Sequence, residues 1–163
     1  MVQYLETPIG ILKLTADQRK LRSVELVEQA GENCPNAPTE NAARQITEYF
    51  LGQRKEFDLF LIYSGTDFER LVWSAMSEIP YGKVVTYGQL AAKIGQPTAC
   101  RAVANAVSKN PFLILLPCHR VVASDGLGGF SADLEAKRKL LTLEGIEISE
   151  SSSFSEKYLF TFS

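Results

Sequence analysis

The sequence has few of the side chains from which metal sites and disulfide frameworks are built. Its 163 residues include one histidine and three cysteines, and no two cysteines form a Cys-x-x-Cys pair. A closed zinc site usually needs four Cys or His ligands, so these residues would all have to meet at one point. An odd number of cysteines also argues against a disulfide framework. We therefore expect no metal and no other cofactor.

Long apolar runs are also absent. No stretch approaches the roughly 20 apolar residues that a membrane-spanning helix needs. The first residues, MVQYLETPIGILKL, lack the basic start and the small-residue cleavage site of a secretory signal. We therefore expect no membrane partner and a cytoplasmic protein, or a nuclear one in a eukaryote.

The chain has no overall excess of positive charge, and its charges are unevenly distributed. The formal net charge is −2, which by itself does not suggest a nucleic-acid partner. Residues 80–145 nevertheless carry eight Lys and Arg against four Asp and Glu, whereas residues 1–79 carry eight against twelve. This asymmetry is compatible with a polyanion bound by the second part of the chain. A solvated surface with uneven charge explains it equally well.

The first 65 residues predict an α+β domain. Residues 2–28 combine β-branched and aromatic residues with two turn signals, which predicts an antiparallel meander of two or three strands. Thr39 is expected to cap a helix whose apolar face includes Ala42 and Ile46. Residues 57–65 predict a further short strand or an extended run.

Residues 66–148 form the second predicted domain, which is mainly helical. Thr66 with Glu69, and Thr86 with Gln89, make capping boxes ahead of apolar residues at helical spacing. The second of these helices and the segment 99–110 together form a helix-turn-helix pattern. An ordinary pair of packed core helices has the same spacing, so both interpretations stay open.

The segment 99–110 has a surface with little bulk, because most of its side chains are those of alanine. A helix that reads bases in the major groove usually offers Arg, Asn or Gln, and here Arg101 and Asn105 are the main polar groups. Such a helix suits close approach to a DNA backbone or a narrow groove. It equally suits tight packing against another helix.

Three further segments complete the pattern. The apolar run 112–117 predicts a buried strand. A last helix is expected to begin at Ser131 or Asp133 and to stop at Gly145. Residues 149–163 are expected to form a tail, and the sequence leaves open whether this tail is ordered.

Cys118 lies at the end of the apolar run, directly beside His119. The pair could be part of a metal site, a catalytic dyad, or two neighbouring core residues. A thiol becomes a nucleophile when a base or a positive charge favours its thiolate. Adjacent residues of a strand point to opposite faces, so contact between the two side chains requires a turn or a bridging water. A Cys hydrolase usually has its histidine far away in sequence, which disfavours that class.

The histidine also needs a partner that fixes its tautomer. Three nearby carboxylates could serve, and the spacing does not choose among Asp125, Asp133 and Glu144.

The stretch IPYGKVVTYGQLAAKIGQPTACRAVANAVSKNPFLILLPCHRVVASDGLGGFSADLEAKRKLLTLEG resembles the C-terminal domain of the O6-alkylguanine-DNA alkyltransferases (methylated-DNA–protein-cysteine methyltransferases). Its Pro-Cys-His-Arg-Val core, residues 117–121, is the most specific part. The resemblance implies an α+β fold: a small ribonuclease-H-like antiparallel sheet with a helix, followed by a mainly helical, winged-helix-like domain that contains a helix-turn-helix.

The resemblance also implies catalytic roles. Cys118 would accept the alkyl group, and His119 would take its proton through a bound water. Glu144 would orient this histidine, and Asn110 would brace the turn beside the active site. Tyr87 would donate to guanine N3 and crowd the 3′ phosphate.

For DNA, the resemblance implies that Arg101 enters the base stack and fills the space of an extruded base. The other expected DNA contacts are Tyr87, Thr98, Ala99, Ala102, Asn105 and Arg120. Val121, Phe130 and Ser131 would line the pocket for the extruded base. Phe130 stands where many relatives have Tyr, so one hydroxyl is missing.

The implied function is the repair of double-stranded DNA, bound by a monomer through the minor groove. The protein would flip out O6-alkylguanine, and also O4-alkylthymine, and transfer the alkyl group irreversibly to Cys118 in a single turnover. The alternative is a non-catalytic sensor that binds the lesion for another repair pathway. Such sensors replace the acceptor cysteine, whereas Cys118 is present here.

Overall fold

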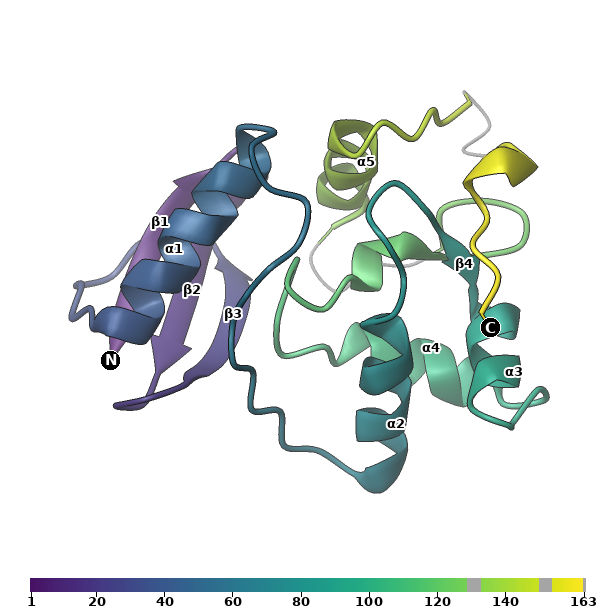
Figure 1. Cartoon of the computed structure of the whole chain (residues 1–163), viewed down its shortest axis with the longest axis horizontal. Coiled ribbons are helices and arrows are strands. Elements are labelled where there is room, and N and C mark those ends of the chain that lie inside the picture. Colours follow the sequence, from purple (N-terminus) through teal and green to yellow (C-terminus); the bar gives the residue numbers. More distant parts are fainter. Residues whose placement is uncertain (129–132, 150–153, 163) are drawn as a thin grey trace. The chain divides into compact units, whose positions relative to one another are not determined.

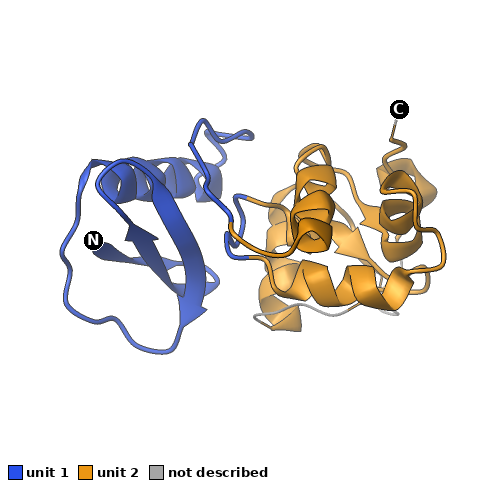
Figure 2. Ribbon diagram, turned by 90° about the horizontal axis from the view of Figure 1, so that it is seen from below, with its two compact units in different colours: residues 1–63, 111–115 blue, residues 64–110, 116–163 orange. Residues whose placement is uncertain are grey.

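The computed structural model describes residues 1–128, 133–149 and 154–162, and the chain divides into two compact units (Figures 1 and 2). Unit 1 comprises residues 1–63 and 111–115, and unit 2 comprises residues 64–110 and 116–163. Unit 1 therefore includes a short segment that lies far from the rest of it in the sequence. Sheet and helices together confirm the predicted α+β class.

Unit 1 is built on a three-stranded antiparallel sheet in the order β1-β2-β3, which confirms the predicted meander. In the central strand, Leu12 and Leu14 are buried and Lys13 between them is half exposed, as period-two alternation requires. The strands are β1 (Val2–Thr7), β2 (Gly10–Ala16) and β3 (Leu21–Val27).

Helix α1 (Ala37–Phe50) covers one face of this sheet (Figure 1). The expected cap, Thr39, is instead the third residue of the helix, and Asn36 is the cap. The Asn36 side chain accepts a hydrogen bond from the Thr39 amide at 3.2 Å, and the Thr39 hydroxyl accepts one from the Asn36 amide at 3.0 Å. The helix begins earlier than expected because asparagine is a good cap and Pro38 is compatible with the first turn.

The apolar run 112–117 is buried as expected but is not a regular strand. Phe112 makes a single bridge to Val24 of β3, and the chain then turns at Ile114, whose φ is 72°. The prediction of a strand over 112–117 is wrong, because an apolar run indicates burial without fixing the backbone conformation. The run 57–65 likewise makes one bridge, between Leu61 and Leu21, and otherwise has no regular secondary structure.

Unit 2 is mainly helical, and its two predicted capping boxes are confirmed. The Thr66 hydroxyl accepts from the Glu69 amide, and the Thr86 hydroxyl accepts from the Gln89 amide. In the described ranges, no helix combines the length and the apolar character needed to cross a membrane. The helices are α2 (Asp67–Met76), α3 (Tyr87–Lys93), α4 (Cys100–Ser108) and α5 (Leu134–Leu143).

Helices α3 and α4 form the predicted helix-turn-helix, joined by residues 94–99. Helix α4 packs on both α2 and α3. The Trp73 indole of α2 donates to the Ala106 carbonyl of α4 at 2.9 Å, which fixes the two helices against each other. The opposite side of α4 is left exposed.

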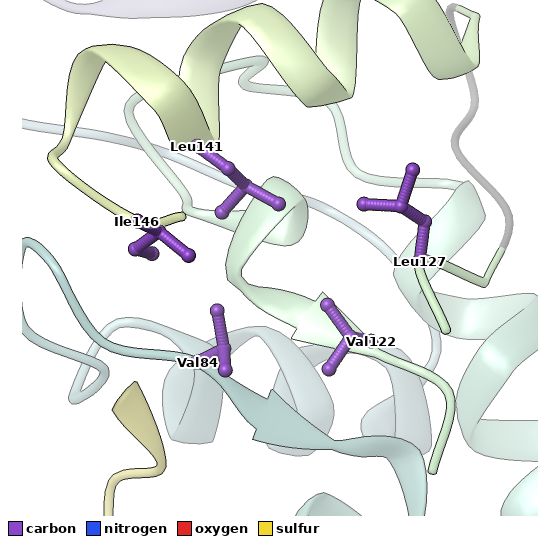
Figure 3. Close-up of a cluster of buried hydrophobic side chains, with 5 residues drawn as sticks. All are labelled: Val84, Val122, Leu127, Leu141 and Ile146. Atoms are coloured by element: carbon purple, nitrogen blue, oxygen red, sulfur yellow. The ribbon is translucent and has the colours of Figure 1, made fainter. Parts of the chain in front are cut away.

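A short parallel pair, β4 (Val85–Thr86) and β5 (Val121–Val122), connects distant parts of unit 2. Strand β4 runs directly into α3, and β5 directly follows Cys118–Arg120. A cluster of buried side chains packs beside this pair (Figure 3), consisting of Val84, Val122, Leu127, Leu141 and Ile146. The pair and the cluster join α3, the Cys118 segment and α5 within one unit.

The C-terminal tail, whose order the sequence left open, packs on unit 2 over residues 154–162. Residues 154–162 contain the short 3-10 turn η2 (Glu156–Tyr158) and pair with the backbone of Val84. The Val84 amide donates to the Tyr158 carbonyl at 2.8 Å, and the Phe160 amide donates to the Val84 carbonyl at 2.9 Å. Phe154 and Tyr158 also pack against the buried cluster. These two aromatic side chains therefore cover part of the buried cluster.

A variant that ends at Ser149 should test this pairing. Hydrogen exchange at the Val84 amide should become at least about tenfold faster, because the amide loses its hydrogen bond and its apolar cover. The Leu14 amide in unit 1 serves as a matched control and should keep its exchange rate. Unchanged exchange at Val84 would contradict the packing of the tail in solution.

Candidate active site around Cys118

Cys118 lies in a turn and not in a strand. Residues Cys118–Arg120 form a single 3-10 turn, η1, directly before β5. The Cys118 side chain is buried, with 2% exposure of the residue. Burial raises the pKa of the thiol to about 11, although the Asn110 side chain and the charge of Lys137 oppose this shift. The resting side chain is therefore a protonated thiol at neutral pH.

His119 is fully buried and held by one hydrogen bond. Its Nε2 lies 2.7 Å from Oε2 of Glu144, and burial lowers the pKa of the imidazole although this carboxylate opposes the shift. Since an ionised carboxylate can only accept, Nε2 carries the proton and Nδ1 keeps its lone pair. Nδ1 is buried and has no hydrogen-bond partner among the residues that the structure describes.

Among the three carboxylates left open by the sequence, Glu144 is the one that meets the histidine. Asp133 instead caps α5 by accepting from the Ala136 amide at 2.7 Å, and Asp125 is exposed. Burial alone would raise the pKa of Glu144, but His119 and Arg120 hold it well below its ordinary value. Glu144 is therefore a carboxylate throughout the physiological pH range.

Arg120 turns into the unit and does not face solvent. Its Nε donates to Oε1 of Glu144 at 2.8 Å, its Nη2 to Oε2 at 2.9 Å, and its Nη1 to the Ile79 carbonyl at 2.8 Å. The residue is 6% exposed. This burial argues against the expected contact between Arg120 and DNA.

Asn110 lies across the turn that precedes Cys118. Its Nδ2 donates to the Leu116 carbonyl at 2.8 Å, and its side chain also hydrogen-bonds Cys118, which lowers the pKa of the thiol. This geometry fits the bracing role that the resemblance implies.

Lys137 is a candidate residue that the sequence reasoning missed. It lies on the buried side of α5, fully shielded from solvent, and its Nζ donates to the Val121 carbonyl at 2.7 Å. Burial lowers its pKa to about 8, an effect that the Cys118 thiolate opposes. The signal in the sequence is a lysine three and four residues before Leu140 and Leu141, on the apolar stripe of the helix.

Tyr87 begins α3 and lies beside Lys137, whose Nζ is 6.0 Å from the centre of the tyrosine ring. Gly128, with φ +72°, approaches so closely that a Cβ there would lie 2.8 Å from the tyrosine ring. The expected pocket residue Val121 is buried in β5. The other two, Phe130 and Ser131, lie outside the described residues.

The exposed side of α4 forms an open groove with a volume of about 850 Å³. It contains four of the six further residues expected to contact DNA, together with Arg101, whose side chain is exposed. The opposite side of the helix buries Val103, Ala106 and Val107. The residues lining the groove are Thr98, Ala99, Arg101, Ala102, Ala104, Asn105 and Ser108.

Comparison with known proteins covers both parts of the chain. Residues 67–146 match the family description "6-O-methylguanine DNA methyltransferase, DNA binding domain", and residues 1–62 match "6-O-methylguanine DNA methyltransferase, ribonuclease-like domain". The chain belongs to the 6-O-methylguanine DNA methyltransferase family. This membership confirms the resemblance drawn from the sequence.

Individual relatives agree with this family. The chain is 42% identical to a methylated-DNA–protein-cysteine methyltransferase of Methanosarcina acetivorans over 86% of its length and 95% of the relative. A Mycobacterium tuberculosis OGT solved in complex with DNA superposes with a TM-score of 0.81, at 38% identity, over 88% of this chain and 91% of that one. A shorter Schizosaccharomyces pombe (S. pombe) protein, solved in complex with damaged DNA containing O6-carboxymethylguanine, gives a TM-score of 0.54 at 32% identity over 61% of this chain and 99% of its own.

Within the described ranges, no group of three or more His, Cys, Asp or Glu side chains is placed to hold a metal. The two further cysteines, Cys34 and Cys100, are exposed, whereas Cys118 is buried. The three thiols can therefore be distinguished by exposure.

The raised pKa of Cys118 can be measured in a Cys34→Ser/Cys100→Ser variant, where it is the only thiol. The ultraviolet absorbance of the thiolate should appear with a midpoint near pH 11, about two units above the ordinary value of 9.0, because burial disfavours the charged form. The same variant with Cys118→Ser added supplies the tyrosine background for subtraction. A midpoint at or below 9 would contradict the predicted resting thiol.

Proposed function

We propose that this protein repairs alkylated DNA by transferring the alkyl group from O6-alkylguanine, and from O4-alkylthymine, to the sulfur of Cys118. The observation that carries the proposal is the buried arrangement of Cys118, His119 and Glu144 in a chain of this family. Relatives named methylated-DNA–protein-cysteine methyltransferase support the same reaction.

The proton of Cys118 must leave before the sulfur can attack, since the resting group is a thiol. Nδ1 of His119 accepts this proton, directly or through a water, because Nε2–H is held by Glu144 at 2.7 Å. The carboxylate then stabilises the imidazolium that forms. General-base assistance of this kind typically contributes about 10²–10⁴ to a rate.

The thiolate attacks the alkyl carbon bonded to O6. The S–C bond forms as the C–O6 bond breaks, and the electron pair of the broken bond goes to the guanine. Tyr87 donates a hydrogen bond to guanine N3 and so helps to stabilise the departing base. Lys137, whose charge favours the Cys118 thiolate, stabilises the sulfur before it reacts.

The product is a thioether on the protein. Water does not readily hydrolyse a thioether, so the free thiol is not regenerated. Each molecule therefore repairs one lesion and is spent.

DNA binds to the α4 groove through the minor groove of the duplex. The alkyl carbon of the lesion is inaccessible inside the stack, so the nucleotide must be flipped into the protein. Arg101, which is exposed on α4, enters the stack in its place. The small side chains of Ala99 and Ala102 let the helix approach closely without selecting a base sequence, which suits lesions that arise anywhere.

A second candidate function is binding of the lesion without transfer. The similarity to the S. pombe protein solved with damaged DNA favours it. Cys118, with its base and orienting carboxylate in place, favours transfer instead.

Intact mass after reaction with a duplex containing O6-methylguanine separates the two functions. The protein should gain the mass of one methyl group, located on Cys118 by peptide mapping, and Cys118→Ser should gain none. Cys34→Ser, which changes an exposed cysteine of unit 1, should react like the unchanged protein. Tight binding without a mass change would favour the sensor, and repeated turnover would exclude the suicide reaction.

Arg101→Ala tests the proposed wedge. Repair of a duplex lesion should slow by about tenfold or more, because extrusion of a base costs a few kcal/mol and the wedge offsets part of this cost. Transfer from free O6-benzylguanine should change little, since no base has to be flipped. Equal losses with both substrates would rule out the wedge role.

A further inference from the structure

Arg120 holds Glu144 in one orientation. Two parallel hydrogen bonds join the guanidinium to the two carboxylate oxygens, at 2.8 and 2.9 Å, and a third fixes the guanidinium to the Ile79 carbonyl at 2.8 Å. A two-point contact of this kind sets the plane of the carboxylate as well as its position. The Arg120 side chain is itself held over the Tyr81 ring, 5.8 Å from its centre.

The other partners of Glu144 depend on this orientation. Oε2 meets Nε2 of His119 at 2.7 Å, and Oε1 accepts from the Gly82 amide at 3.1 Å. Each oxygen thus serves the guanidinium and one further donor. Rotation of the carboxylate would break the contact with His119, and the Arg120 fork opposes that rotation.

The charge of Arg120 also acts on His119. The side chains of His119 and Glu144 are fully buried and that of Arg120 is 8% exposed, so water screens these charges poorly. Burial is the largest cause that lowers the pKa of His119, Glu144 raises this pKa, and the charges of Arg120 and Lys137 lower it further. Cys118 and Tyr81 are further titratable groups of this site, and burial raises the pKa of each.

We propose that Arg120 is a positioning residue for alkyl transfer: its fork fixes Glu144 against His119, and its charge opposes the charge of Glu144 at the histidine. This inference rests on the proposed function for its catalytic meaning. The effect of Arg120 on the protonation of His119 can be observed without substrate.

The test uses the single histidine of the chain, whose imidazole nitrogens give one set of signals in a ¹⁵N-labelled, untagged protein. The variants are Arg120→Gln, which removes the charge, and Arg120→Lys, which keeps the charge but lacks the planar fork. Transfer is measured with free O6-benzylguanine, so that DNA binding does not enter. Arg70→Gln, which removes an exposed guanidinium from α2, is the matched control and should behave like the unchanged protein.

In the unchanged protein we expect a neutral His119 at pH 7, protonated at Nε2. Arg120→Gln should raise the titration midpoint of His119 by about one pH unit, so that transfer falls more at pH 6 than at pH 8, by at most about tenfold. Arg120→Lys should leave the midpoint close to that of the unchanged protein and slow transfer about tenfold at both pH values, because Glu144 is less well oriented.

An unchanged midpoint in folded Arg120→Gln would overturn the electrostatic role, and an unchanged rate in Arg120→Lys would overturn the fork. If Arg120→Gln does not fold, Arg120→Lys decides alone: the proposal then requires both a retained midpoint and a slower rate. Failure of the proposed function would give a different result. The unchanged protein would then transfer no alkyl group, while the His119 midpoint would still shift in Arg120→Gln and stay the same in Arg120→Lys.

Discussion

Unit 2 depends on the hydrogen bonds and ion pairs that the buried carboxylate of Glu144 makes. This carboxylate joins the end of α5 to the turn Cys118–Arg120 and to the Gly82 amide, and Arg120 extends the network to the Ile79 carbonyl beyond α2. Removing one partner of a buried ion pair typically costs about 3–5 kcal/mol, because the other charge is left uncompensated. The same contacts therefore stabilise the unit and set the state of the proposed base.

Local signals predicted the helices better than the segment that carries the cysteine. The capping boxes at Thr66 and Thr86 involve neighbouring residues, so the sequence displays them directly. Asn36 and Thr39 both suit a cap, and the choice between them depends on where the first turn can form. The run 112–117 shows its burial but not its turn at Ile114, since an apolar run carries no information on backbone dihedrals.

The site required contacts between residues far apart in sequence. Glu144 lies 25 positions from His119, and no periodicity distinguishes it from Asp125 or Asp133. The resemblance to a known family selected it. Lys137 was missed because it is one of several basic residues in its helix. Only its place on the apolar stripe indicates that it is buried. Arg120 was expected to contact DNA, whereas its side chain is buried against Glu144.

Burial of Cys118 has a consequence for the time before any lesion is met. Oxidants attack thiolates that solvent can reach, and Cys118 is neither ionised at rest nor accessible. Under the proposed function each molecule reacts only once, at Cys118. Oxidation of this sulfur by peroxide would therefore inactivate the molecule before it repaired a lesion. The raised pKa of Cys118 makes a base necessary for transfer. It also protects the unreacted thiol from oxidation.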